Sequence, residues 1–492
     1  MDATTVTHEI QPVFDSRSCV LLLGTMPSPA SRKQGFYYGH PQNRFWRVLA
    51  AIFDEPAPRT VEEKRDMLLR HNIALWDVLA SCEIEGASDS SIRDAQPNDL
   101  ARIFDAADIR AVFATGTKAG ELYRKLIEPT LGVPCTTLPS TSPANAKMKL
   151  DDLADAYGKA LLPLLGKPEK HVLPVADVVK LEQAIAKNGT SLSTLMERAG
   201  RALAKAAFDE TRAAPRIAIL CGSGNNGGDG WVAARELASM GCAVDLVTKR
   251  PASDISAEPA HEQALITEGV ASKTADAAHA SSLQTATAAQ HAGTGAIVIH
   301  VSPSDDELAS LLAAADVIVD AILGTGFSGD TVLAPYDAWI RLANKQRSRG
   351  ARIVAADVPS GLSAQTGKAA EPCLKAHETV TMIASKPGLE TPYAFAFCGT
   401  VRVAPLAYIE PILEGWKQQE TENDASTGND GSADSSAATG ANAALDASAI
   451  SKQPSPMHDA FRRAETEDDD GYDPYSDRPP TPEPLFQADP WN

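Results

Sequence analysis

Two long stretches of this chain each alternate short apolar runs with amphipathic helical patterns, and this repeated alternation limits the fold more than any other feature. Continuous apolar runs of about four to eight residues are typical of strands buried on both faces of a sheet. Alternation of such strands with helices predicts a parallel sheet covered by helices. The runs are residues 20–24, 74–76, 111–116 and 136–139 in the first stretch and 216–222, 243–249, 296–301, 315–323 and 351–359 in the second. The sequence therefore predicts two α/β domains, each a three-layer αβα sandwich.

Changes in composition mark the ends of these domains. Residues 166–174 (GKPEKHVLP) contain two prolines, a glycine and charged residues, which is typical of a short linker. Residues 416–492 are rich in Ser, Ala, Gly, Asp and Pro and poor in aliphatic side chains, so this acidic tail is expected to be disordered. The predicted division is a first domain at 1–165, the linker, a second domain at 175–415 and the tail.

The net charge is distributed unevenly between the two domains and the tail. The chain of 492 residues has a formal charge of −19 at pH 7, which by itself argues against a polybasic nucleic-acid-binding protein. However, the tail alone has 16 acidic and 5 basic side chains, whereas residues 1–166 have 21 and 18, and residues 167–415 have 27 and 22. Both domains are only mildly acidic, so the composition permits a local basic surface on either one.

The cysteines, the N-terminal segment and the lengths of the apolar runs give expectations about the cellular compartment. The seven cysteines show no C-x-x-C pair and no histidine spacing that fits a zinc site, so we expect reduced, buried thiols. The start MDATTVTHEIQPVFD lacks the basic region and apolar run of a signal peptide. No segment approaches the roughly 18 continuous apolar residues of a membrane span. These features predict a cytoplasmic location and no membrane partner.

The first domain contains three motifs rich in polar and aromatic residues. They are GTMPS (24–28), YYGHPQNRFW (37–46) and LPSTSPA (138–144). The first and third stand at the ends of predicted strands, and the carboxyl ends of parallel strands are where open α/β sheets bind ligands. The basic side chains near these motifs suffice to hold a few phosphates, with base binding left to aromatic and amide groups. These basic residues are Arg32, Lys33, Arg44, Arg47, Lys147 and Lys149.

The three motifs, in this order over about residues 10–165, resemble the uracil-DNA glycosylase superfamily, and the second is similar to that of its hypoxanthine branch. The resemblance implies a uracil-DNA-glycosylase-like domain that flips deaminated adenine out of DNA and hydrolyses its N-glycosidic bond. The family's catalytic asparagine corresponds to Asn43. A neutral amide is no strong base, so Asn43 would position water and hydrogen-bond the departing base. Other DNA- or base-binding residues implied by the motifs are Gly24, Thr25, Pro27, Ser28, Tyr38, His40, Phe45, Ser140 and Ser142.

Further features of this domain concern the choice of base. The aromatic rings of Phe36, Tyr37 or Phe45 could stack on a flipped base. Many superfamily members have a histidine at the position of Leu138, so uracil-DNA glycosylase activity remains an alternative. No cysteine cluster matches the iron–sulfur branches of the superfamily, so we expect no iron–sulfur cluster.

The second domain has oxygen-rich residues at three predicted strand ends. Residues 222–227 satisfy G-x-G-x-x-G, but the next strand ends in Lys249 and Arg250 rather than in the acid that holds the ribose of NAD, which disfavours a NAD dehydrogenase. Backbone N–H groups at a helix start hold anions, and amide and carboxylate oxygens hold hard cations. The strand ends together predict a phosphate-binding loop and a cation site; their oxygen-bearing residues include Asn225, Asn226, Asp229, Asp320, Asp330, Asp357 and Ser360.

The motifs LMERAG (195–200), NNGGDG (225–230), DAILGTG (320–326) and DVPSG (357–361) together resemble the NAD(P)H-hydrate epimerase family over about residues 172–412. The resemblance implies a Rossmann-like domain that interconverts the R and S epimers of hydrated NADH and NADPH, which are substrates rather than cofactors. It also implies Asp357 as general acid and base, Lys386 near the substrate, and a potassium ion held by Asn226, Asp320 and Ser360. The implied substrate contacts are Asn225, Asn226, Gly227, Gly228, Asp229, Gly324, Thr325, Gly326, Phe327, Ser328, Gly329, Asp330 and Asp357.

The predicted function is therefore a fusion of a hypoxanthine-DNA glycosylase with an NAD(P)H-hydrate epimerase. The expected partners are DNA for the first domain and hydrated NADH or NADPH for the second, with a homodimer as a further expectation. An alternative is a nucleotide- or DNA-binding regulatory protein in which one or both sites are inert. The tail combines an acidic run with aromatic residues, which is typical of a solvated disordered segment, and docking of its aromatic side chains into a groove on a partner protein is the alternative. Those aromatic residues are Tyr472, Tyr475, Phe486 and Trp491.

Overall fold

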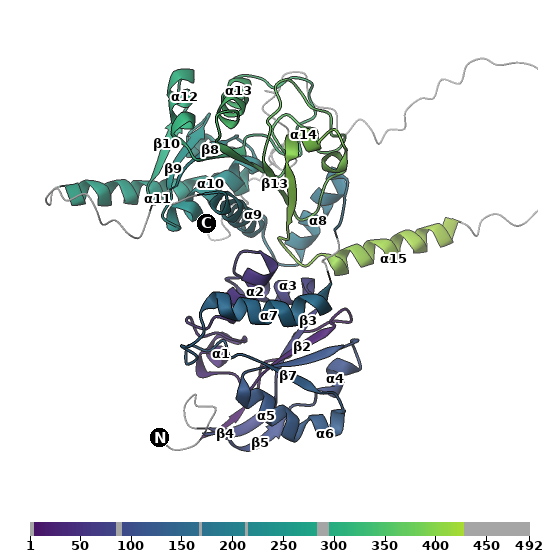
Figure 1. Cartoon of the computed structure of the whole chain (residues 1–492). Helices are drawn as coiled ribbons and strands as arrows, with labels where there is room; N and C mark the ends of the chain where they lie inside the picture. The colour runs from purple at the N-terminus through teal and green to yellow at the C-terminus, as the bar shows by residue number, and fades with distance from the viewer. Residues whose placement is uncertain (1–3, 85–90, 167–169, 212–214, 283–294, 428–492) are drawn as a thin grey trace, which may run out of the picture.

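The protein consists of two lobes, each built around a parallel sheet (Figure 1). The structure, a computed structural model, describes residues 4–84, 91–166, 170–211, 215–282 and 295–427. The expected α/β architecture is thus confirmed for both stretches.

The first lobe contains a four-stranded parallel sheet in the order β3-β2-β6-β7. Its strands are β2 (Val20–Gly24), β3 (Ile73–Asp77), β6 (Ala111–Thr115) and β7 (Cys135–Leu138). All residues of β2 and β3 are buried, as their apolar runs predict. A second, antiparallel sheet consists of β1 (Thr4–Thr7), β4 (Leu79–Ile84) and β5 (Arg93–Pro97). Sequence analysis missed this sheet because its outer strands, TTVT and RDAQP, are largely polar and exposed.

Helices cover the first parallel sheet. α3 (Val61–Arg70) contacts β3, α5 (Thr117–Leu126) contacts β6 and β7, and α7 (Leu150–Leu165) contacts both β2 and α2 (Phe45–Phe53). The remaining helices are short: α1 (Pro29–Gln34), α4 (Ala101–Phe104) and α6 (Glu128–Leu131). Each motif therefore precedes or follows an element that the core holds in place.

The second lobe contains seven parallel strands in the order β10-β9-β8-β11-β12-β13-β14. Their bounds are β8 (Arg216–Cys221), β9 (Ala243–Thr248), β10 (Ile297–Val301), β11 (Val317–Ala321), β12 (Arg352–Ala356), β13 (Glu378–Met382) and β14 (Thr400–Ala404). The last two strands lack a continuous apolar run, so sequence analysis missed them. In β13 the buried Thr379 satisfies its hydroxyl by donating to the carbonyl of Cys398 at 2.8 Å, which lets a polar strand enter the core.

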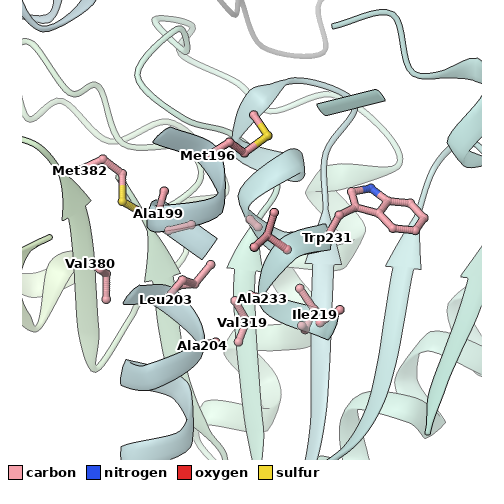
Figure 2. Packing of buried hydrophobic residues seen from close by; sticks show 14 of the residues in the cluster. Met196, Ala199, Leu203, Ala204, Ile219, Trp231, Ala233, Val319, Val380 and Met382 are labelled. Carbon is pink, nitrogen blue, oxygen red and sulfur yellow. The ribbon is translucent and has the colours of Figure 1, made fainter. Parts of the chain in front are cut away.

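Helices also cover both faces of the second sheet. α9 (Leu192–Asp209), α10 (Asn225–Ser239) and α11 (Glu258–Ser282) share one hydrophobic cluster, whereas α12 (Asp305–Ala314) and α13 (Tyr336–Arg347) share another. Figure 2 shows α9 placing Met196, Ala199 and Leu203 in the first cluster with Val319 of β11 and Val380 of β13. The other helical elements of this lobe are α8 (Val175–Lys187), η2 (Ala252–Asp254), η3 (Pro387–Glu390) and α14 (Phe395–Cys398).

The predicted linker and tail differ from the structure at their edges. The linker's last residues belong with the second sheet, because the Leu173 N–H donates to the carbonyl of Ser385 at 2.9 Å. The expected disordered tail at 416–492 begins as a helix: α15 (Glu410–Thr427) passes the predicted boundary, because Ile412, Leu413 and Trp416 pack on the second core. The rest of the tail, including its aromatic docking residues, lies outside the described residues.

Two further features concern the cysteine thiols and the length of apolar helices. All seven cysteines are free, and six of them are buried. No helix in the described ranges is both long and apolar enough to cross a membrane.

Ion pairs join the two lobes. Arg198 and Arg201 of α9 pair with acidic side chains of α3 in the first lobe. Arg201 Nη2 donates to Glu63 Oε1 at 2.6 Å, and Arg198 Nη1 lies 3.2 Å from Asp66 Oδ2 and donates to the Leu406 carbonyl at 2.7 Å. Burial favours the protonated form of Glu63, but the hydrogen bond and charge of Arg201 outweigh it, so the pKa of this carboxyl is lowered. Glu63 is therefore ionised and depends on α9 for its counter-charge.

We expect the buried pair of Arg201 and Glu63 to contribute more to stability than the more exposed pair of Lys205 and Asp54. The Arg201 side chain is 9% exposed, whereas Lys205, also on α9, bonds to an Asp54 side chain that is 62% exposed. Breaking a buried pair leaves an uncompensated charge and costs about 3–5 kcal/mol, whereas an exposed pair contributes about 0–1 kcal/mol. Arg201→Ala should thus lower the free energy of unfolding, measured by urea denaturation, far more than Lys205→Ala. Equal losses in the two variants would contradict this account of the lobe contact.

Candidate functional sites

The first candidate site lies at the carboxyl edge of the β3-β2-β6-β7 sheet. Gly24 ends β2, Thr115 ends β6, and Ser140 follows β7, so the first and third motifs meet there. The Gly116 N–H donates to the Leu138 carbonyl at 2.9 Å, and a Cβ on Gly116 would lie 3.3 Å from the Ser140 side chain. Close packing of the strand ends thus brings the motifs together.

Asn43 joins the second motif to the third. Its Oδ1 accepts the backbone N–H of Phe45 at 2.9 Å and the hydroxyl of the buried Thr141 at 3.0 Å. A backbone N–H can only donate, so the orientation of the amide is determined and its NH₂ group is directed away from these two donors. Asn43 therefore offers a hydrogen-bond donor, and its carbonyl oxygen is occupied within the protein. Sequence analysis did not identify Thr141 as the partner.

Arg44 has a different role from the phosphate contact predicted for it. Its guanidinium donates to backbone carbonyls of the third-motif loop, at 2.9 Å to Ser142 and 2.8 Å to Asn145, and also to Met148. These bonds use the donors that a phosphate would need. Arg44 is thus a positioning residue for the loop, whereas other predicted cations are exposed around the site; these are Arg32, Lys33, Arg47, Lys147 and Lys149.

The aromatic residues of the second motif are more buried than stacking on a flipped base would require. Phe45 is 0% exposed, and its ring stacks on Tyr38 with 3.8 Å between centroids. Phe36 and Tyr37 are also buried, and the Tyr37 hydroxyl donates to the carbonyl of Gln11 at 2.8 Å. Burial in the core contradicts direct stacking of Phe36, Tyr37 or Phe45 on a base. Tyr38 is the partly exposed ring of this group, and its hydroxyl lies 2.7 Å from that of Thr115.

The remaining predicted residues of this site lie in its loops. The hydroxyl of Ser28 caps α1 by accepting the Ser31 N–H at 3.2 Å, and that of Ser140 accepts the Ser142 N–H at 3.2 Å. Each hydroxyl can still donate its own proton to a phosphate. His40 is exposed, and its Nδ1 accepts the Gln42 N–H at 3.2 Å. Thr25 and Pro27 are buried beside these loops.

Sequence analysis missed one buried pair of a histidine and an aspartate at the same edge. Asp77 ends β3 in register with Gly24, and its Oδ2 lies 3.0 Å from Nε2 of His8. The signal was present, because the apolar run of β3 ends in an acidic residue. The histidine partner could not be identified because it lies 69 positions earlier in the chain.

The second candidate site begins where β8 leads into α10. The N-cap of α10, Gly224, makes no side-chain cap hydrogen bond, and a helix start of this kind can receive an anion. Glycine is required by close packing in this loop: a Cβ on Gly227 would lie 2.0 Å from the Gly222 carbonyl oxygen, and one on Gly228 would lie 2.5 Å from Met196 Sδ. The predicted phosphate-binding geometry therefore has a steric basis.

Asp320, Ser360 and Asn226 meet below this loop. Asp320 is 0% exposed, and its Oδ1 accepts the Ser360 hydroxyl at 2.6 Å. Burial raises the pKa of Asp320 to about 6, although its hydrogen bonds oppose that shift. The Asn226 NH₂ donates to the Leu323 carbonyl at 3.0 Å, whereas Asn226 Oδ1 is buried without a hydrogen-bond partner among the described residues. Leu323 and Ser360 link this unsatisfied oxygen to the desolvated carboxylate, and oxygens of these kinds match the chemistry of a cation site.

Asp357 lies at the end of β12 with a left-handed backbone, φ +60°. Its Oδ1 accepts the Thr381 hydroxyl and the Met382 N–H, each at 3.1 Å, and also bonds to Lys386 Nζ. Lys386 is 1% exposed, and its ammonium also donates to Thr381 and to the Met382 carbonyl at 3.0 Å each. Lys386 is thus fully used in holding Asp357, whose Oδ2 accepts no hydrogen bond within the described part of the chain.

The loop at 324–330 divides into two parts. Gly324 lies against Asn226, since a Cβ on it would lie 3.1 Å from Asn226 Cβ, and Thr325 and Gly326 follow directly. Phe327, by contrast, packs in the hydrophobic core, and the exposed Asp330 pairs with Lys368 at 2.6 Å. These two side chains are not directed to the Asn226 and Asp320 cluster in this conformation, which differs from their predicted role. Ser328 and Gly329 are exposed.

Comparison with known proteins divides the chain in the same way. The family model "Uracil DNA glycosylase superfamily" matches residues 11–163, and "YjeF-related protein N-terminus" matches residues 192–388. A hypoxanthine DNA glycosylase of Methanosarcina acetivorans is 36% identical over 137 residues, which are 27% of this chain and 85% of that protein. An NAD(P)H-hydrate epimerase of Pirellula staleyi is 33% identical over 234 residues, which are 47% of this chain and 90% of that protein.

A bifunctional NAD(P)H-hydrate repair enzyme of Coxiella burnetii is also similar, with 36% identity over 234 residues. The match covers 48% of this chain, and the chain spans only 41% of the length of that relative. The hypoxanthine DNA glycosylase and the NAD(P)H-hydrate epimerase, in contrast, are covered over 85% and 90% of their length. The chain therefore belongs to the uracil DNA glycosylase superfamily through its first domain and to the YjeF-related family through its second.

Proposed function

We propose that residues 1–165 form a glycosylase that removes hypoxanthine from DNA. The observation that supports this most directly is the fixed amide of Asn43, which links the second and third motifs and offers an N–H donor at the sheet edge. The relative named hypoxanthine DNA glycosylase, similar over 137 residues, supports the same base. The exposed cations around the site would hold the DNA backbone by its phosphates.

The geometry refines the role of Asn43. Cleavage of the N-glycosidic bond places negative charge on the departing base and positive charge on the sugar. Asn43 Oδ1 is occupied by Phe45 and Thr141, so its NH₂ group donates to the departing base or to the oxygen of the attacking water. A fixed donor aimed at developing charge lowers the barrier without reorganisation. Both expected roles of Asn43, positioning water and hydrogen-bonding the departing base, would then fall to its NH₂ group.

We propose that residues 175–415 epimerise hydrated NADH and NADPH. The observation that supports this most directly is the geometry of Asp357. Its Oδ1 accepts hydrogen bonds from three donors, whereas its Oδ2 accepts none among the described residues. Inversion at a carbon requires one of its bonds to break and to re-form on the opposite face, with a proton removed and returned. Asp357 Oδ2 would accept and return that proton, and the first turn of α10 would hold a phosphate of the dinucleotide.

We further propose that a potassium ion binds in this domain. The residues present fit it, because Asn226 Oδ1 is an unsatisfied buried oxygen and Asp320 is a desolvated carboxylate bonded to Ser360. Among the described residues no group of three or more His, Cys, Asp or Glu side chains could hold a metal ion, and a single carboxylate suits a monovalent cation better than a divalent one. The ion would supply the positive charge that orients the oxygens beside Gly324.

Replacement of Asn43 tests the first proposal. Asn43→Ala should lower excision of hypoxanthine about 10²–10³-fold, the usual effect of removing one donor to developing charge. The measurement is alkali-induced strand scission of an inosine-containing duplex under single-turnover conditions. Gln42→Ala is a matched control, because Gln42 is an exposed amide one residue away. Equal rates for Asn43→Ala and the wild type would rule out Asn43 as the catalytic group.

Replacement of Asp357 tests the second proposal. Asp357→Asn keeps the size of the side chain but removes the proton acceptor, so equilibration of the R and S hydrates should slow about 10²–10⁴-fold. Separation of the two epimers by chromatography over time gives the rate. Asp305→Asn, which changes an exposed carboxylate at the start of α12, should leave it unchanged. An unaltered rate in Asp357→Asn would refute its role.

The cation site predicts a linked effect of potassium and pH on stability. The pKa of Asp320 is raised to about 6 in the folded protein, so without a cation its contribution to stability is present at low pH and is lost as pH rises through about 6. Potassium should restore stability above that pH by binding the folded form. Melting temperatures at pH 7.5 should therefore be higher in potassium chloride than in choline chloride for the wild type, but equal for Asp320→Asn. A potassium increment that persists in Asp320→Asn would contradict this site.

A further inference from the structure

A cavity of about 550 Å³ lies between the two lobes, and its lining includes none of the residues of the two candidate sites. The first lobe contributes the ends of α2 and α3, the linker contributes Lys170 and His171, and the second lobe contributes β14 and the segment that follows it. Small-molecule sites usually have volumes of about 300–1,000 Å³ and often lie at domain interfaces. Because both lobes line this cavity, neither lobe alone would form it.

Most charged side chains that line the cavity already have a counter-charge within the protein. Their pairing uses hydrogen-bonding positions that a charged ligand would otherwise occupy. The remaining ionisable residues of the lining are His171 and Glu410. The paired groups, with 2.6–2.8 Å between the paired atoms, are Glu55 with Arg70 and His71, Asp54 with Lys205 and Arg402, and Lys170 with Glu390.

His171 and Glu410 are buried with incomplete hydrogen bonding. His171 Nε2 lies 3.7 Å from Glu410 Oε1, which is longer than a hydrogen bond. Among the described residues, neither His171 Nε2 nor Glu410 Oε2 has a hydrogen-bond partner, although both atoms are buried and Glu410 is only 9% exposed. Burial of a carboxylate is costly unless the group is paired and hydrogen-bonded, so stability alone does not explain a glutamate here.

The backbone fixes both residues at the cavity. The His171 carbonyl accepts the Ser385 N–H at 2.9 Å, which attaches the linker to the second lobe. Glu410 is the first residue of α15, and Leu413 of the same helix is buried in the second core. The unsatisfied imidazole and carboxylate are therefore held in place by the fold.

Apolar side chains supply much of the remaining lining. In the first lobe the Phe53 ring stacks on His71 with 3.5 Å between ring centroids, and Leu162 of α7 is 46% exposed. An exposed leucine beside a cavity leaves apolar surface that a ligand can cover. The second lobe adds Ile383, Val401, Val403 and Ile409.

We propose that this cavity binds a small organic ammonium ion with an apolar body. An ammonium group has three N–H donors and a positive charge, so it would donate to Glu410 Oε2 and to the lone pair of His171 Nε2. It would also supply the counter-charge that Glu410 lacks. An anionic ligand would be repelled by Glu410, and a neutral one would leave its charge uncompensated. The apolar body would lie against Phe53 and Leu162.

The charge requirement is tested by titrating the intact protein with phenethylamine and with phenethyl alcohol, which has the same body and a neutral hydroxyl. Isothermal titration calorimetry gives both affinities. The wild type should bind the amine roughly tenfold or more tightly than the alcohol, the effect of a hydrogen bond between charged groups. Equal affinities would mean that His171 already supplies the counter-charge of Glu410, and this result would overturn the proposal. Absence of saturable binding of the amine would overturn it as well.

The position of the site is tested by Glu410→Gln, which keeps the size of the side chain and removes its charge. This variant should bind phenethylamine roughly tenfold or more weakly and should bind the alcohol as the wild type does. Glu414→Gln is the matched control, because Glu414 lies on the same helix with a side chain that is 58% exposed, and its affinities should be unchanged. An unaltered affinity for the amine in Glu410→Gln would rule out this carboxylate as the binding group.

A variant in the first lobe tests whether the ligand lies between the lobes, and it also covers the case in which Glu410→Gln does not fold. Leu162→Trp places a larger ring at an exposed position of the lining, so it should fill part of the cavity and weaken binding of both compounds. Thermal melting of each variant identifies a loss that is only structural. Wild-type affinities in a folded Leu162→Trp protein would contradict binding in this cavity.

Discussion

The carboxyl edges of the two parallel sheets are the constraint on which both sites depend. Helices cover the sheets, so residues of β2, β3, β8 and β11 are almost uniformly buried and mostly apolar. The polar groups of the two candidate sites lie where the strands end, and parallel pairing brings those ends to one edge. Asp77, Thr115 and Asn43 collect at the first edge, and Asp320 and Asp357 at the second. Each site is thus a consequence of sheet topology combined with a few side-chain hydrogen bonds.

The helix α9 connects the second sheet to the first domain. One of its faces packs Met196 and Leu203 into the core of the second domain (Figure 2). The other presents Arg198 and Arg201 to the acidic residues of α3. The LMERAG motif includes Arg198, so a motif shared with the epimerase family also contributes to the contact between domains. Met196 of this helix also lies against Gly228 in the glycine-rich loop, which places the lobe contact close to the second candidate site.

Sequence patterns predicted the parts of the fold that rest on local signals. Buried runs such as VLLLG and glycine-rich turns such as NNGGDG have a direct physical meaning in one strand or one loop. The strand β13 was missed because its buried threonines satisfy their hydroxyls through distant partners, Thr379 through Cys398. Arg44 was assigned to phosphate because its carbonyl partners lie about a hundred positions away, at Ser142 and Asn145. Likewise, the stacking of Phe45 on Tyr38 depends on how a turn closes, which motif spacing does not reveal.

The central claim is that one chain contains two separate active sites, one at each sheet edge. The most direct measurement assays hypoxanthine excision and hydrate epimerisation side by side in the intact wild-type protein and in its Asn43 and Asp357 variants. The account predicts that the wild type performs both reactions and that each variant loses one reaction while keeping the other. Loss of both reactions in either variant, with the fold intact, would contradict two independent sites, as would a wild-type protein that performs neither.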